Sequence, residues 1–448
     1  MLIIKILIGL VGLGVVVFVH ELGHFLAARL VGIDVEAFSI GWGKPVLKKK
    51  IGNVEYRLGM FPVGGYCKMK EESDYREAWE NMRSGKKSEK GSYLASSPLS
   101  RIVVSFSGPF FNLIFAILLL SLIWGIGFEI NTLGNRIILA SDISPGQYPA
   151  DSAGLQTGDR IIEIAGKNIS YYHEVQENIA INPEKNLPIT VDRGGEIMRL
   201  TVTPSLDKST GAGKIGVYFW TDPVIGSVSE GSQAQLAGLL PGDRITAANG
   251  VPVRYSLDLL KVMEVHPESL VLEYERGGQT GLAEIKTSGL QNDPGFAWKS
   301  IQYRTPNLSV PGAIAKGVKE GYKTLAVSVK SLKLLFMGID LTQAVSGPMR
   351  ITYMMGDMAA QGFGQGIGTG LRSIIDFIAL ISIALCVMNL LPLPILDGGM
   401  IILFLVEMIR RKPAHPKAIS IFQTCGMVII FGLMVFAVFG DIMYFVRR

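Results

Sequence analysis

His20, Glu21 and His24 lie within an apolar stretch near the start of the sequence. Histidines four residues apart share one face of a helix, so both imidazoles can reach a single metal ion. Glu21 can take a proton from a water molecule held by that ion, which is the chemistry of a metal-dependent hydrolase. Ionisable groups at membrane depth are costly and are usually functional. The alternative is a metal-free pair of histidines at the membrane interface.

The composition indicates a membrane protein with sizeable soluble parts. Of the 448 residues, 48% are hydrophobic and only 18% are charged. The net charge of +5 is small, and no basic run is interleaved with aromatic residues, so we expect no nucleic-acid binding. The three cysteines form neither a disulfide framework nor a Cys-x-x-Cys pair. A third metal ligand must therefore come from another histidine or from a carboxylate.

Four apolar segments are long enough to cross a bilayer. The expected spans are 1–30, 102–127, 368–397 and 420–448. Lys and Arg residues are concentrated in the connections 31–101 and 398–419, which predicts that both connections face the cytoplasm. The long segment between the second and third spans, and both termini, would then lie on the opposite side of the membrane.

This topology predicts that a carboxylate meets the two histidines. The first span reaches His20 after about 27 Å of helix rise, and the third span runs in the same direction and ends near Asp397. Two histidines and one carboxylate, with the fourth position open, are typical of a catalytic zinc site. The predicted topology puts this site toward the cytoplasmic side of the membrane. The alternative role of Asp397 is a polar cap at the end of the span.

Pro392 and Pro394 cannot continue a regular helix up to Asp397. The backbone groups that they free need partners or water, which predicts an unwound, partly hydrated segment beside the metal. We expect this segment to contact the substrate. Asn389 can hydrogen-bond the substrate backbone there, and its alternative role is a hydrogen bond between helices.

A small sheet is predicted over residues 35–70, because the pattern changes there from helical to alternating. Tyr56 and Leu58 belong to one expected strand, and Gly64-Gly65 marks a turn before the next strand. An exposed edge of this sheet could bind an extended peptide by strand addition. We therefore count these four residues among the substrate-binding candidates.

The segment between the second and third spans contains an internal repeat. Residues 153–161 recur 84 positions later as 237–245, with Ala-Gly-Leu and Gly-Asp-Arg-Ile in both copies. The repeat predicts two β-rich modules over 128–220 and 221–309, which resemble PDZ domains. The apolar and lysine pattern of 310–367 predicts amphipathic helices on the membrane surface. The alternative there is a helix packed on the second module.

The expected fold is a polytopic α-helical membrane protein. It has four transmembrane helices, a small cytoplasmic β-sheet and two tandem PDZ-like α+β domains outside the cytoplasm.

With His20, Glu21, His24 and Asp397 in place, the chain resembles the site-2 protease family of intramembrane zinc metalloproteases. Further motifs that carry the resemblance are 38–44, Gly64-Gly65-Tyr66, 107–109 with Asn112, 346–348, and 389–399. The resemblance covers the whole chain.

The resemblance implies one Zn²⁺ ion bound by His20, His24 and Asp397, with Glu21 as the general base. It implies that Asn389 helps to hold the substrate and that the sheet around 54–70 pairs with the unwound substrate strand. The implied substrates are single-span anti-sigma factors already trimmed on their outer side, and remnant signal peptides. The PDZ-like pair would exclude untrimmed substrates.

The implied location is the bacterial inner membrane, in regulated proteolysis of an envelope stress response. The PDZ-like domains and both termini would be periplasmic. A non-catalytic membrane scaffold, in which the PDZ-like pair gathers partners, is the alternative function. A transporter is disfavoured, because four spans with one metal site and no inverted repeat do not match that class.

Overall fold

The computed structural model describes residues 2–71, 90–208, 210–265, 268–286, 294–334, 347–412 and 414–446. Parts of three predicted segments, 72–89, 287–293 and 335–346, lie outside the described residues. The chain divides into two compact units, Met1–Phe128 with Thr305–Arg448, and Glu129–Arg304.

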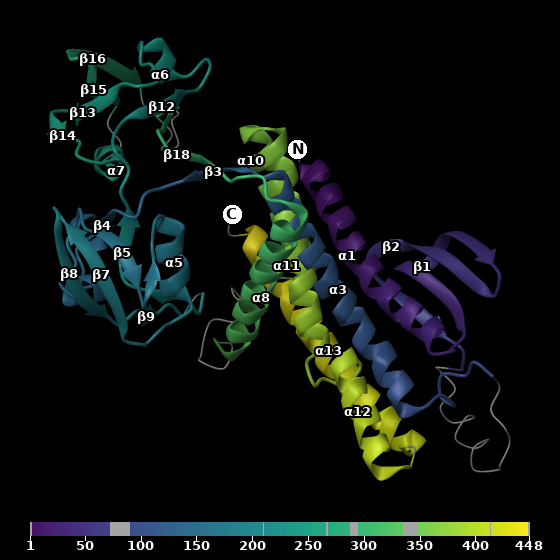
Figure 1. Cartoon of the computed structure of the whole chain (residues 1–448). Coiled ribbons are helices and arrows are strands. Elements are labelled where there is room, and N and C mark those ends of the chain that lie inside the picture. Colours follow the sequence, from purple (N-terminus) through teal and green to yellow (C-terminus); the bar gives the residue numbers. More distant parts are fainter. Residues whose placement is uncertain are drawn as a thin grey trace. The chain divides into compact units, whose positions relative to one another are not determined.

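The first unit is built mainly from helices (Figure 1). They are α1 Leu2–Leu30, α3 Pro98–Ile126, α8 Val310–Leu334, α10 Pro348–Gln365, α11 Ile367–Asn389, α12 Asp397–Arg410 and α13 Pro416–Val446. Four of the described helices are long and apolar enough to cross a membrane, as the sequence predicts. These stretches are Lys5–Leu30, Pro98–Ile126, Ile367–Asn389 and Lys417–Val446.

Helix α3 packs against α1, α8, α11 and α12. Small residues allow the backbones to approach closely: a β-carbon at Gly23 of α1 would lie about 2.5 Å from the Ser107 carbonyl oxygen of α3. Gly317 of α8 faces Ser121 of α3 in the same way. The sequence left open whether the helix in this region lies on the membrane surface or packs on the second module. In the structure, α8 packs along α3 and α11.

The third span is shorter than expected. Helix α11 ends at Asn389, and a separate helix, α12, begins at Asp397. Asp397 is therefore in the first turn of α12 rather than on the third span, and the predicted connector 398–419 contains most of α12. The break follows from the two prolines between the helices and from Ile395, whose φ is 78°.

The predicted small sheet is present and packs on α1. It consists of two long antiparallel strands, β1 Val35–Ile51 and β2 Val54–Met69, each of which bends and pairs twice. The resulting order of segments is 45–51, 54–58, 37–40 and 65–69. Within the described residues, segment 65–69 pairs on one side only, so it is an edge of the sheet.

Tyr56 and Leu58 lie in the inner segment of this sheet. Tyr56 pairs with both Phe38 and Lys49, and Leu58 pairs with both Ile40 and Leu47. Their backbones are therefore occupied on both sides. The prediction that Tyr56 and Leu58 pair with a substrate strand is wrong, whereas Gly65 lies on the edge.

The second unit contains two modules that share one order of elements, to which the first module adds η1, β9 and β10. The first comprises β4 Ile137–Leu139, η1 Ala140–Asp142, α4 Pro149–Ser152, β5 Arg160–Ile164, β6 Lys167–Asn168, α5 Tyr172–Ala180, β7 Leu187–Arg193, β8 Glu196–Val202, β9 Ser205–Leu206, β10 Gly213–Lys214 and β11 Val217–Phe219. The second comprises β12 Ile225–Val228, α6 Gln233–Leu236, β13 Arg244–Ala248, β14 Val251–Pro252, α7 Ser256–Glu264, β15 Ser269–Arg276, β16 Gln279–Lys286 and β17 Phe296–Trp298. Their main sheets have the matching orders β6-β5-β7-β8 and β14-β13-β15-β16.

An ion pair with a buried aspartate recurs in the two modules and explains the aspartate of the repeated Gly-Asp-Arg-Ile sequence. Arg193 holds Asp159 through two hydrogen bonds of 2.8 Å, and Arg276 holds Asp243 through bonds of 2.6 and 2.7 Å. Both aspartates are only 1% exposed. The fork-shaped pairing fixes the loop before β5 and β13 in the same way.

The second unit is an insertion whose two ends meet. Strand β3, Glu129–Thr132, pairs with β18, Ile301–Arg304. In the first unit, the Thr305 amide donates to the Phe128 carbonyl oxygen at 2.8 Å, and the Phe128 amide donates to Thr305 Oγ1 at 2.8 Å. The helical unit is thus continuous across the insertion point.

Candidate metal centre

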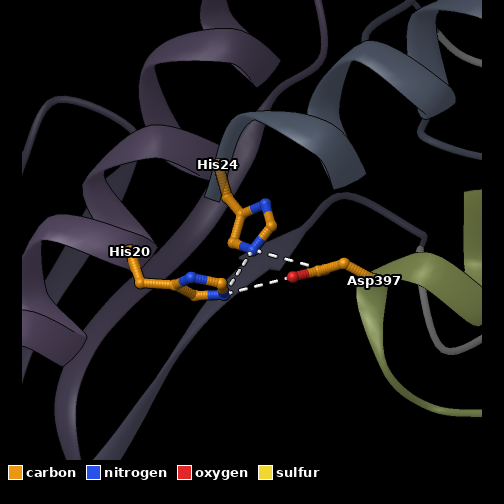
Figure 2. Close-up of side chains that lie close together, drawn as sticks. All are labelled: His20, His24 and Asp397. Carbon is orange, nitrogen blue, oxygen red and sulfur yellow. Dashed lines mark hydrogen bonds and ion pairs between the residues drawn. The ribbon is translucent and has the colours of Figure 1, made fainter. Parts of the chain in front are cut away.

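His20, His24 and Asp397 converge at one point, as Figure 2 shows. The two Nε2 atoms are 3.1 Å apart. Asp397 places Oδ2 3.2 Å from Nε2 of His20 and Oδ1 3.5 Å from Nε2 of His24. Both histidines are buried, and Asp397 is partly buried. The topology argument from the sequence therefore brought the correct carboxylate to the pair.

These separations fit a zinc ion. Ligand atoms about 2.0–2.1 Å from a tetrahedral ion lie roughly 3.3 Å from one another. The three measured distances, 3.1, 3.2 and 3.5 Å, scatter around that value. Two imidazoles and one carboxylate leave the fourth position for water or substrate, so the donor set is that of a catalytic site.

Helix α3 packs against both histidine rings. A β-carbon at Gly108 would lie 2.6 Å from a ring carbon of His24 and 2.8 Å from one of His20, so glycine makes room for both rings. Nδ1 of His24 lies 2.8 Å from the Val104 carbonyl oxygen, and Nδ1 of His20 lies 3.3 Å from the amide of Asn112.

Two features hold Asp397 at the start of α12. The backbone of the preceding loop folds directly onto Gly398 and Gly399, where any side chain would overlap the loop. At the other end of α12, Glu407 accepts a 2.7 Å hydrogen bond from Arg101 of α3. Helix α12 is therefore fixed at both ends, and the carboxylate with it.

Glu21 lies between α1 and the edge of the sheet. The backbone of Cys67, in the edge segment, lies close enough to interact electrostatically with the carboxylate of Glu21. A β-carbon at Gly65 would lie 3.1 Å from Glu21 Cγ, which shows how closely the edge segment 65–69 approaches this side chain. The candidate general base and the edge segment of the sheet thus adjoin each other, beside the histidines.

The remaining substrate-binding candidates differ in exposure and in their contacts. Asn389 ends α11, is partly buried and has no hydrogen bond within the described residues. Pro392 is exposed, whereas Pro394 packs against Gly426 of α13. Gly64 opens the edge segment with a φ of 83°.

Tyr56 and Leu58 line a separate apolar cavity of about 670 Å³ between α1 and the sheet. The α1 residues that line it are Phe18, Leu22 and Phe25. Residue 22 is about 200° around the helix from His20, so this cavity is on another face of α1. The structure therefore does not bring Tyr56 and Leu58 to the metal centre.

Sequence reasoning assigned no role to three groups that surround the histidines. They are the Val104 carbonyl, Gly108 and the Asn112 side chain. The motif 107–109 with Asn112 had been noted only as part of the resemblance; the four-residue spacing of Gly108 and Asn112, which puts both on one face of a helix, was a further signal. A backbone carbonyl gives no signal in a sequence.

Comparison with protein-family models matches residues 8–433 to Peptidase family M50. A protein of Treponema pallidum (strain Nichols) named "Putative zinc metalloprotease" is 37% identical over 445 residues, covering 98% of this chain and 99% of that protein. A Haemophilus influenzae protein named "Regulator of sigma E protease" is 30% identical over 453 residues, covering 96% and 97%. The matched range includes the whole candidate centre.

Proposed function

Because this chain belongs to peptidase family M50, we propose that it is a zinc endopeptidase that cleaves single-span membrane proteins within or near the bilayer. The observation that carries the proposal is the convergence of two imidazoles and one carboxylate, 3.1–3.5 Å apart, on helices of a membrane-type bundle. Enzymes of this class need no covalent intermediate.

In this proposal His20, His24 and Asp397 hold one zinc ion, and Glu21 is the general base. Zinc bound there polarises the scissile carbonyl and makes water a nucleophile near neutral pH. Glu21 accepts the proton of the attacking water and passes it to the leaving amine. Glu21 lies beside the edge segment of the sheet, where a β-carbon at Gly65 would be 3.1 Å from its Cγ.

The substrate must present an extended backbone to this site. A transmembrane helix hides its amides in its own hydrogen bonds, and each unpaired group in lipid costs several kcal/mol. We assign the replacement partners to the backbone at Gly64 and Gly65, where the edge segment begins, and to Asn389, whose side chain has no partner within the described residues. The broken segment around Pro392 and Pro394 leaves space for this unwound chain.

The finer substrate assignment rests on the relative named regulator of sigma E protease. We propose anti-sigma factors already trimmed on their outer side, and remnant signal peptides, as the substrates of an envelope stress response. The two modules of 129–304 would act as PDZ-like size filters that exclude untrimmed proteins. Their repeated architecture supports a shared role.

We further propose that the enzyme resides in the bacterial inner membrane, with the modules and both termini in the periplasm. The support is the concentration of Lys and Arg in 31–101 and 398–419, which favours cytoplasmic placement of these connections. The metal centre would then lie toward the cytoplasmic side.

The test is cleavage of a tagged single-span anti-sigma factor, truncated on its outer side, by the full chain in liposomes. We expect the wild type to cleave it and Glu21→Gln to bind zinc equally while losing about 10²–10⁴-fold in rate. His20→Ala should lose both zinc and cleavage. A fully active Glu21→Gln variant, or cleavage that persists without zinc, would overturn the proposal.

A further inference from the structure

We propose that Asn112 is the positioning residue for the metal ligand His20, with its amide oxygen Oδ1 accepting the Nδ1–H proton of the imidazole. This inference deepens the proposed function and rests on it. Its basis is the surroundings of Nδ1 in His20 and in His24, the ring nitrogens that face away from the centre.

His24 shows what such a ligand requires. Its Nδ1 lies 2.8 Å from the Val104 carbonyl oxygen, which can only accept a hydrogen bond. Nδ1 of His24 therefore carries the proton, and the lone pair of Nε2 points toward the centre. A second group that fixes the tautomer is the usual arrangement for histidines that bind metal.

His20 needs the same arrangement, and Asn112 is the neighbour of its Nδ1. The amide nitrogen Nδ2 lies 3.3 Å from Nδ1, in a fully buried position. A donor in that place selects the tautomer in which Nε2 of His20 carries the proton. A protonated Nε2 has no free lone pair for the metal. The other amide atom, Oδ1, is buried without a hydrogen-bond partner.

A half-turn of the amide solves both problems at once. It exchanges Nδ2 for Oδ1 and leaves the outline of the side chain unchanged. Oδ1 then gains a donor, and the lone pair of Nε2 on His20 is freed for the ion. The exchange is favoured when Nδ1 carries the proton, because the buried acceptor Oδ1 then gains a donor.

The backbone at Asn112 is held in place for this role. Ser382 of α11 donates from Oγ to the Asn112 carbonyl oxygen at 2.8 Å, and Ser382 is fully buried as well. This hydrogen bond fixes the backbone from which the side chain of Asn112 reaches His20. Ser382→Ala provides a matched control, because it removes a hydrogen bond at the same residue without altering the amide.

The test measures the zinc dissociation constant of the purified full chain in detergent, by competition with a chelating dye. Asn112→Leu, which has a similar size and no acceptor, should weaken zinc binding about 10–100-fold. Asn112→Asp, which offers an acceptor in the same place, should restore binding to within about threefold of the wild type. Asn112→Ala replaces the Leu variant if the latter does not fold, which the melting temperature of the zinc-free protein reports.

The outcomes separate three cases. Wild-type affinity in the variant without an acceptor would overturn the inference while leaving the proposed function intact. Equal losses in Asn112→Asp and Asn112→Leu would show a structural role and would also overturn it. A wild-type chain that binds no zinc would overturn the proposed function itself, together with the inference.

Discussion

At the scale of single residues, the proposed contact of Asn389 with the substrate can be tested directly. Replacing Asn389 with Ala should lower kcat/KM by about 2–13-fold, which corresponds to the roughly 0.5–1.5 kcal/mol of one hydrogen bond. Zinc content should stay unchanged, because Asn389 is not a ligand. The measurement is steady-state cleavage of the tagged single-span substrate.

Ser373→Ala at the other end of α11 is the control for this prediction. Its hydroxyl donates only to Thr369 of the same helix, so its loss should leave kcat/KM unaffected. An Asn389→Ala variant with wild-type kcat/KM would show instead that this side chain does not touch the substrate.

The residue types and spacings predicted the centre better than its surroundings. Two histidines one helical turn apart are recognisable in any sequence, and the topology pointed to Asp397. Tyr56 was misplaced because alternation in a sequence identifies a strand but not whether both its sides are paired. The groups that contact the outer nitrogens of the histidines, such as the Val104 carbonyl, could not be predicted, because their position depends on how α1 packs on α3.

At the scale of elements, the pair Arg101 and Glu407 fixes α12 to α3. Their side chains are only 6% and 3% exposed, and the Arg101 guanidinium also lies 4.6 Å from the Phe404 ring centre. Arg101→Met should destabilise the fold by about 3–5 kcal/mol, because Glu407 stays buried without its charge partner. Thermal unfolding in detergent measures this loss.

The double variant Arg101→Met, Glu407→Met is the matched control. It removes both charges, so much of the lost stability should return. A single variant as stable as the wild type would mean that this pair does not hold α12.

The buried aspartate of the second module predicts a response to acid. Burial alone would raise the pKa of Asp243, but hydrogen bonds from Arg276 and from the Leu240 amide outweigh burial and lower the pKa. The resulting stability is present above the unfolded-state pKa of about 3.9 and is lost as the pH falls through the lower folded-state pKa. Protection factors of β13 amides in hydrogen exchange should therefore fall below about pH 4.

Arg276→Leu should lower these protection factors at pH 7 and flatten their pH dependence. Lys286→Leu, on an exposed position of the same sheet, should leave the profile unchanged. An unaltered acid transition in Arg276→Leu would contradict the assigned cause.

Element boundaries were less predictable than the number of spans. Hydropathy found all four candidate membrane helices, since length and apolar content are visible in sequence. It merged α11 with the following loop, because the leucines from 390 to 396 are as apolar as the helix itself. Only the prolines signalled the break, and the restart of a helix at Asp397 depends on the glycines that accommodate the loop.

At the scale of the whole molecule, the unit Glu129–Arg304 is inserted between Phe128 and Thr305, whose backbones already bond to each other. Replacing 129–304 with a short Gly/Ser linker should therefore leave zinc affinity within about twofold of the wild type, because all three candidate ligands belong to the first unit. The same variant should cleave untrimmed substrates that the full chain rejects. Continued rejection would contradict the size-filter role of the modules.

The most direct test of the central claim is zinc quantification combined with X-ray absorption on the purified full chain. We expect one zinc per chain with nitrogen and oxygen ligands at about 2.0–2.2 Å and no sulfur at about 2.3 Å. The ion should be lost when His20, His24 and Asp397 are all replaced by Ala. Sulfur ligands, or zinc that persists in the triple variant, would contradict a centre built from these three side chains.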